Sequence, residues 1–106
     1  MIATRKAEQA LLRANEFVLF KYPLGLTGTT PHRVIIHERE WVWAVPVILT
    51  SPGYGSVGEV GMVLVDEEAR TIVGYTPHDE VASAIKRLRE DKSIEIEAAF
   101  LRARKI

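Results

Sequence analysis

The segment most similar to a nucleotide-binding motif is GYGSVGEV, which spans residues 53–60. Its G-x-G-x-x-G-x-V spacing occurs in dinucleotide-binding loops and in the glycine loop of protein kinases. A dinucleotide site needs this loop to lead from a strand into a helix, because helix N–H groups bind the phosphates. Here the loop lies between two predicted strands, and the downstream lysine of a kinase is missing. We therefore expect a hairpin turn whose glycines supply positive φ angles.

Histidines and acidic residues are the other side chains that could bind a metal or transfer a proton. His37 begins the tetrapeptide HERE, which is not the H-E-x-x-H zinc motif and starts at the end of a predicted strand rather than on a helix. Asp66, Glu67 and Glu68 lack the alternating oxygen ligands and central glycine of a calcium loop. We expect no catalytic residue, no metal site and no cofactor.

Glu59, His78 and Asp79 are the polar groups that a pocket between a helix and a curved sheet would use. Glu59 alternates with apolar Val57 and Val63, so it could face the interior. The alternative interpretation is that all three are exposed. Acidic residues in a first helical turn are expected from the helix dipole alone.

Composition excludes several classes of function. Among 106 residues, Lys plus Arg and Asp plus Glu each number 14, so the net charge is zero, and there is no cysteine. A neutral chain lacks the long-range field that attracts nucleic acid, so we do not expect nucleic-acid binding. Without cysteine there is no disulfide and no thiolate site. No apolar run reaches about 18 residues and the start lacks the apolar core of a signal peptide, so we expect no membrane association and a cytoplasmic protein.

The elements that must position any site follow from the hydrophobic periodicity. Ala7, Leu11, Ala14 and Val18 lie on one face of a helix predicted over residues 4–20, and residues 22–31 are predicted to be a loop. Four strands follow, over residues 33–37, 41–49, 57–66 and 71–75. Thr76 and Pro77 precede a helix that ends near Asp91, and Ser93 caps a third helix.

Tight turns between consecutive strands require antiparallel pairing. We therefore predict one α+β domain over residues 1–106, with the element order α-β-β-β-β-α-α. In it an antiparallel four-stranded meander packs against the N-terminal helix, and two helices follow at the C-terminus.

The strand over residues 41–49 is apolar on both faces. One face carries Trp41, Trp43, Val45, Val47 and Leu49, and the other carries Val42, Ala44, Pro46 and Ile48. Pro46 cannot donate a ladder hydrogen bond, so the strand is bulged there or faces an edge. A strand that is apolar on both faces must be covered twice, and a small domain covers one side with its own helices. The second side predicts a partner, for which the candidate contact residues are Trp43, Pro46, Ile48 and the loop residue Tyr54.

The block from Trp41 to Val81 resembles the small bacterial immunity-protein and PepSY-type domains of cystatin-like fold. The resemblance rests on W-x-W-x-V-P-V, a glycine loop, V-G-E-V-G-M-V-L-V-D, a short acidic turn, T-I-V-G-Y and a helix starting P-H-D-E-V. It implies a helix packed across a curved antiparallel sheet. It also implies a function exerted by binding, as in toxin neutralisers or protease-inhibitor-like modules, with no catalytic residues to carry over.

The sequence thus predicts a small non-catalytic protein-interaction module, immunity- or inhibitor-like, that acts as a homodimer. The alternative is a small-molecule-binding, hydrolytic or isomerase-type α+β cone protein with a pocket between helix and curved sheet.

Overall fold

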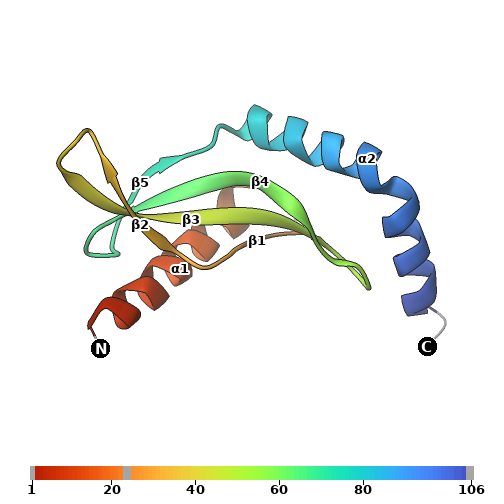
Figure 1. Ribbon diagram of the computed structural model, residues 1–106, viewed down its shortest axis with the longest axis horizontal. Helices are drawn as coiled ribbons and strands as arrows, with labels where there is room; N and C mark the ends of the chain where they lie inside the picture. Colours follow the sequence, from red (N-terminus) through yellow and green to blue (C-terminus); the bar gives the residue numbers. More distant parts are fainter. Residues whose placement is uncertain (1, 23–24, 105–106) are drawn as a thin grey trace.

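The computed structural model describes residues 2–22 and 25–104 of the chain. It has the predicted α+β architecture, in which the antiparallel meander follows an N-terminal helix and precedes a C-terminal helix along the chain (Figure 1). In chain order the elements are α1 (Ile2–Lys21), β1 (Leu26–Gly28), β2 (His32–Ile36), β3 (Glu40–Ser51), β4 (Gly55–Asp66), β5 (Ile72–Tyr75) and α2 (His78–Arg104).

The prediction of three helices is wrong, because residues 78–104 form a single kinked helix. Lys92 alone has non-helical angles inside α2, with φ −119° and ψ 17°. The expected stop near Asp91 and restart at Ser93 therefore mark a kink rather than two helix ends. One irregular residue is enough to bend a helix, but it does not separate the two parts by a loop.

The sheet also contains a fifth strand that the sequence pattern does not reveal. β1 lies inside the predicted loop and pairs antiparallel with β3, with Leu26 opposite Leu49 and Gly28 opposite Val47. Three residues are too few for an alternation to be recognised, and glycine and threonine around them indicate a turn.

Two short strands share the same edge of β3 and leave a gap at Pro46. β1 pairs with residues 47–49 and β2 with residues 40–44. The carbonyl of Pro46 faces this gap, where it accepts hydrogen bonds from the backbone N–H and the hydroxyl of Thr29, at 2.8 and 3.0 Å. Pro46 therefore stands where its missing N–H costs no ladder hydrogen bond, and register shifts follow directly after Val47 and after Leu49.

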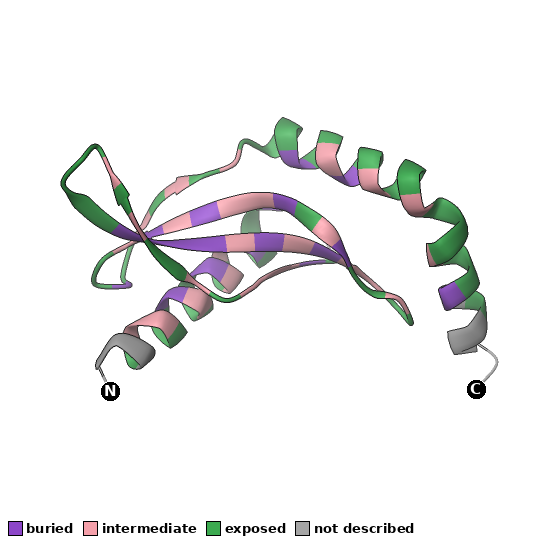
Figure 2. Cartoon of the chain, in the orientation of Figure 1, coloured by how far each residue is buried: buried purple, intermediate pink, exposed green. Residues whose placement is uncertain are grey.

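Both helices pack on the same face of the sheet. A Cβ atom added at Gly28, opposite Val47, would meet Leu11 and Asn15 of α1 at 3.2 and 3.1 Å. A Cβ atom added at Gly61, which pairs with Val47 from the other side, would meet Val81 of α2 at 3.2 Å. These glycines let the helices approach the strands closely. The alternation of buried and partly buried residues along β3 and β4 is visible in Figure 2.

The core lies between this face and the helices. Ala14 and Val18 of the predicted apolar stripe are fully or almost fully buried, as is Ala10 beside them, whereas Ala7 and Leu11 are partly buried against the core. From the sheet and α2 the most deeply buried core side chains are Val45, Val47, Val63, Val65 and Val81. Small side chains on α1 permit a short distance between helix and sheet, because side-chain bulk sets that distance.

Tyr22, at the end of α1, ties this helix to the start of α2. Its hydroxyl donates a hydrogen bond of 2.6 Å to the carbonyl of Thr76, and its ring contacts Phe17 edge-to-face. The Thr76 hydroxyl accepts a hydrogen bond from the backbone N–H of Met62 at 2.8 Å. Thr76 therefore joins β4 to the helix start rather than capping α2.

Stability above pH 10 should depend on Tyr22. Burial, and secondarily the charge of Tyr75, raise the pKa of Tyr22 above its ordinary value of 10.0. As pH rises, the unfolded chain thus loses the Tyr22 proton before the folded chain does. The contribution of protonated Tyr22 to the free energy of unfolding is therefore complete below about pH 10 and is lost as pH rises through the raised pKa of the folded state. We expect the free energy of unfolding of Tyr22→Phe to fall less than that of the wild type between about pH 9 and pH 11 in urea titrations. Equal slopes for Tyr22→Phe and the wild type would contradict the assignment.

Candidate functional site

The predicted pocket groups are not gathered in one place. Glu59 is exposed and lies opposite Ile48 in the β3–β4 register. It lines a groove of about 150 Å³ against residues 84–91 of α2. His78 and Asp79 are exposed in the first turn of α2 and are not part of the lining of that groove. Glu59 therefore lines a groove beside α2, and neither His78 nor Asp79 lines that groove with it.

The three histidines lie at separate, exposed positions: His32 on β2, His37 in the β2–β3 turn, and His78 on α2. Within residues 2–22 and 25–104 no group of three or more His, Asp or Glu side chains is arranged to hold a metal ion. His37 and Glu38 both have positive φ angles, 49° and 67°, which form the reversal between the two strands. Their observed role is to shape a turn.

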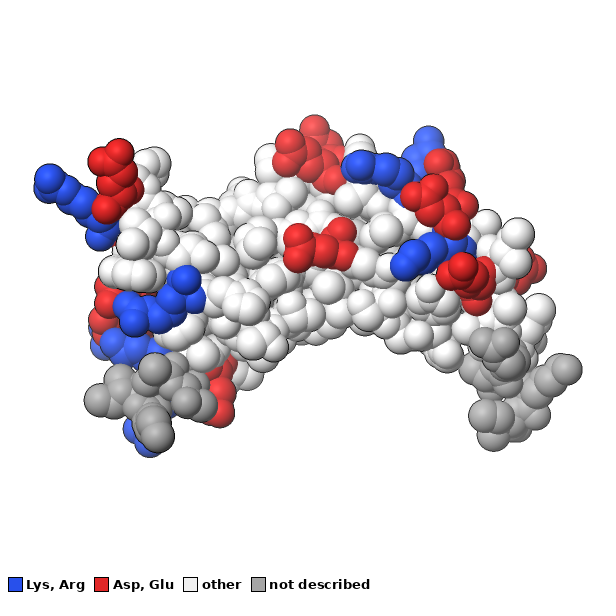
Figure 3. Space-filling model, in the orientation of Figure 1, with Lys and Arg blue, Asp and Glu red and all other residues white. Residues whose placement is uncertain are grey.

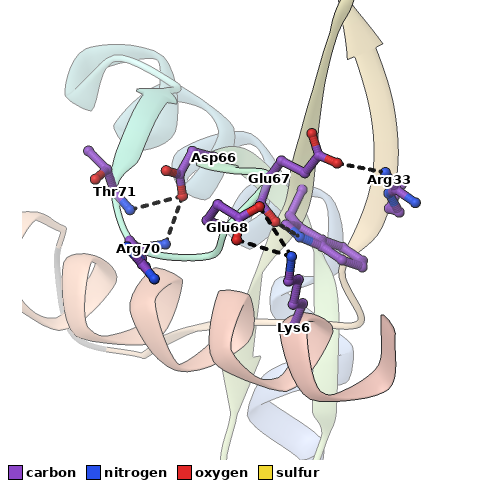
Figure 4. Close-up of polar contacts among 8 residues, drawn as sticks. Lys6, Arg33, Asp66, Glu67, Glu68, Arg70 and Thr71 are labelled. Atoms are coloured by element: carbon purple, nitrogen blue, oxygen red, sulfur yellow. Dashed lines mark hydrogen bonds and ion pairs between the residues drawn. The ribbon is translucent and has the colours of Figure 1, made fainter. Parts of the chain in front are cut away.

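The acidic turn after β4 is a structural junction (Figure 4). Asp66 accepts hydrogen bonds from the backbone N–H groups of Arg70 and Thr71, at 2.7 and 3.1 Å, so it closes its own turn. Glu68 pairs with Lys6 of α1 at 3.1 Å, and Glu67 pairs with Arg33 of β2 at 3.3 Å. The carboxylates thus join the turn to α1 and to β2.

The two tryptophans of β3 share a face but differ in environment. Trp43 is 5 % exposed, belongs to the core, and donates a hydrogen bond of 3.1 Å from Nε1 to the carbonyl of Glu67. Trp41 is 41 % exposed and lies under the guanidinium of Arg33, 4.8 Å from the ring centroid. Of the two, Trp43 was the candidate partner contact, yet it is enclosed by this chain itself.

Tyr54 closes the tip of the β3–β4 hairpin against the kink of α2. Its hydroxyl donates to Glu95 at 2.9 Å, and Nζ of Lys92 lies 5.9 Å from its ring centroid. Lys92 also donates a hydrogen bond of 3.0 Å to the carbonyl of Val57. Gly53 and Gly55 flank Tyr54 with φ angles of 76° and 91°, as expected for a hairpin turn rather than a phosphate-binding loop. Tyr54 and Lys92 thus hold the kink beside β4.

The other two candidates, Pro46 and Ile48, lie on the face of the sheet opposite the helices. We call this surface the open face; it consists of Val42, Ala44, Pro46, Ile48, Met62 and Leu64. Every one of these side chains is apolar and is buried or half-buried. The prediction that β3 has two apolar faces is thus confirmed, and the helices cover the one that carries Trp43.

A second apolar surface, which the sequence reasoning missed, lies on the helices. Leu12, Leu19 and Phe20 of α1 are 63, 71 and 93 % exposed, and Ile94 and Leu101 of α2 are 83 and 51 % exposed. In the view of Figure 3 the basic side chains lie toward the two ends of the molecule, and acidic side chains interrupt the otherwise uncharged surface between them. The signal was present in the sequence, because Leu12 and Leu19 fall on the side of α1 opposite Ala10 and Ala14.

Comparisons of the chain with protein-family models, with curated proteins and with solved structures find no match. The resemblance to cystatin-like domains therefore remains a prediction. No helix in the part of the chain that the structure describes is long and apolar enough to cross a membrane.

Proposed function

We propose that this protein is a non-catalytic protein-interaction module that acts as a homodimer. The observation that carries the proposal is the amount of surface that the isolated chain exposes. A second copy is the partner that this surface favours, because a chain with zero net charge does little to oppose its own association.

The exposed surface is larger than a compact chain of this mass should have. It amounts to 7299 Å². The size relation for folded monomers gives about 6,000 Å² for 11.9 kDa. The surplus of about 1,300 Å² exceeds the roughly 800 Å² that each partner contributes to an interface of standard size. An interface of ordinary dimensions would therefore remove more than half of this surplus.

The shape of the chain supports the same conclusion. Its principal extents are 48 × 30 × 22 Å, and its radius of gyration is 15.4 Å. A compact chain of 106 residues should have a radius of gyration of about 13 Å. The elongation places apolar side chains of α1 and α2 at the surface instead of in one core.

The open face supplies the surface on which an immunity- or inhibitor-like module would bind another protein. Its apolar side chains, including Pro46 and Ile48, lie on the face away from both helices. Such a role needs shape and apolar area rather than reactive groups. It is also the role that the resemblance to cystatin-like domains implies.

Sedimentation equilibrium at micromolar concentration tests the homodimer directly. We expect a mass of twice 11.9 kDa that declines toward one chain on dilution. Solution scattering at the same concentrations should show one closed assembly rather than a growing series. A mass of one chain at every concentration up to the solubility limit would overturn the homodimer.

A further inference from the structure

We infer that two copies of this chain associate by reciprocal helix packing: the end of α2 of each copy packs on the outer face of α1 of the other copy. The inference rests on the homodimer proposed above and identifies its interface. We call residues 93–104, which follow the kink at Lys92, the arm.

The arm has one side that is covered and one that is not. Ile96 packs against the core and Ala99 is buried. Ile94, Ala98 and Leu101 are exposed and follow one another at intervals of four and three residues, so they lie on one face of the helix. Figure 1 shows this half of α2 turning away from the line of its first half. The arm therefore presents a free apolar stripe on a helix whose direction is set by the kink.

The outer face of α1 carries two exposed leucines at a matching spacing, with Glu16 between them. Leu12 and Leu19 point away from the core side that Ala10 and Ala14 define, and Phe20 lies beside Leu19. Leu12 and Leu19 are seven residues apart, as are Ile94 and Leu101. Seven residues correspond to about 10.5 Å along a helix axis, so both pairs can meet in one helix–helix contact.

A groove beside Leu12 gives the arm a place of suitable charge. It holds about 380 Å³ between α1 and the turn after β4. Its lining has three basic residues, Lys6, Arg13 and Arg70, and two acidic ones, Glu16 and Glu68. The first nine residues of the arm, 93–101, carry Glu95 and Glu97 and no basic residue. The groove and the acidic part of the arm, residues 93–101, thus have opposite net charge, which favours their contact, whereas the arm as a whole is neutral because two arginines follow at residues 102 and 104.

Exposed area decides between this interface and the open face. All six open-face side chains are already buried or half-buried, whereas the five helix side chains are 51 to 93 % exposed. The gain from burial is proportional to the apolar area removed from water. The helices therefore have more to gain from a second copy, and in this arrangement the open face stays available for another protein.

Two substitutions test this reciprocal packing, one on each side of the helix–helix contact. Ile94→Lys and Leu12→Glu both replace largely exposed side chains, so the folded chain should keep the wild-type circular dichroism spectrum. In a two-fold dimer each substitution occurs at both contacts. We expect either variant to raise the dimer dissociation constant by about 100-fold, tenfold at each contact. Ser83→Lys, an exposed position on α2 before the kink, is the matched control and should leave the constant unchanged.

Mixing the two variants provides the decisive measurement. A dimer with one chain of each kind has one unaltered contact and one in which the introduced lysine of the first variant would face the introduced glutamate of the second. Association should therefore return in the equimolar mixture. If Leu12→Glu alone leaves the dimer dissociation constant at its wild-type value, or if the mixture stays monomeric, the reciprocal packing is wrong. If both variants dimerise like the wild type, the interface lies elsewhere and the homodimer stands. A monomeric wild type removes the homodimer itself.

Discussion

Replacing Trp43 by alanine should lower the free energy of unfolding by about 3 to 5 kcal/mol, the cost of truncating a large buried aromatic side chain. Trp43 fills the core on the helix side of β3 and also donates a hydrogen bond to the Glu67 carbonyl. The substitution removes both, and the surrounding valines belong to strands that cannot collapse fully into the space. The loss is a large part of the stability of an ordinary small domain.

Trp41→Ala is the matched control, since it lies on the same face of the same strand two residues earlier. Its ring is partly exposed and its main described contact is the stacking of Arg33. We expect a loss of about 1 kcal/mol. Urea denaturation followed by fluorescence of the remaining tryptophan measures both, at one fixed protein concentration because association shifts the midpoint. Losses of equal size would show that the two rings do not differ in burial as described.

A charge placed at Val47 should prevent folding. Val47 is completely buried between Gly28 and Gly61, on the face that both helices cover. Val47→Asp would put a carboxylate in an apolar site without a partner. The cost, about 4 kcal/mol or more, approaches the whole stability of a small domain. We expect a chain with the circular dichroism spectrum of an unfolded protein.

Ile48→Asp carries the same change one residue further along β3, on the open face. The charge there can reach water, so we expect a folded protein that has lost about 1 to 2 kcal/mol through strand propensity and partial burial. Amide exchange and circular dichroism distinguish the two variants. Two folded variants, or two unfolded ones, would contradict the assignment of the faces.

The fold class could be predicted because its signals are local. The alanine spacing of α1, the alternation along β3 and β4, and the glycines around Tyr54 each report one element and its turn. β1 was missed because three residues in a glycine- and threonine-rich segment carry no periodicity. The kink at Lys92 produced the signals of two helix ends, Asp91 before it and Ser93 after it, although the helix direction merely changes there.

The candidate site was harder to predict because it depends on which surfaces meet. Trp43 and Ile48 are equally apolar in the sequence, and only the packing of both helices on one face separates a core residue from a surface one. Local sequence likewise places Leu12 and Leu19 opposite the alanine stripe of α1. The sequence alone does not show that the other elements of the described chain leave these two leucines uncovered. Glu59 was a candidate through its alternation, but a register shift beside it brings it next to α2 at the surface.

The gap at Pro46 has a consequence for how the chain avoids fibres. The segment from Trp41 to Leu49 is long, apolar and rich in β-branched residues, which is the composition that adds strands from other molecules. Its outer edge is occupied by β2 at one end and by β1 at the other. Between them an incoming strand would find a residue without a donor, whose carbonyl Thr29 already occupies. The most aggregation-prone stretch of the protein is therefore unable to act as a template along its length.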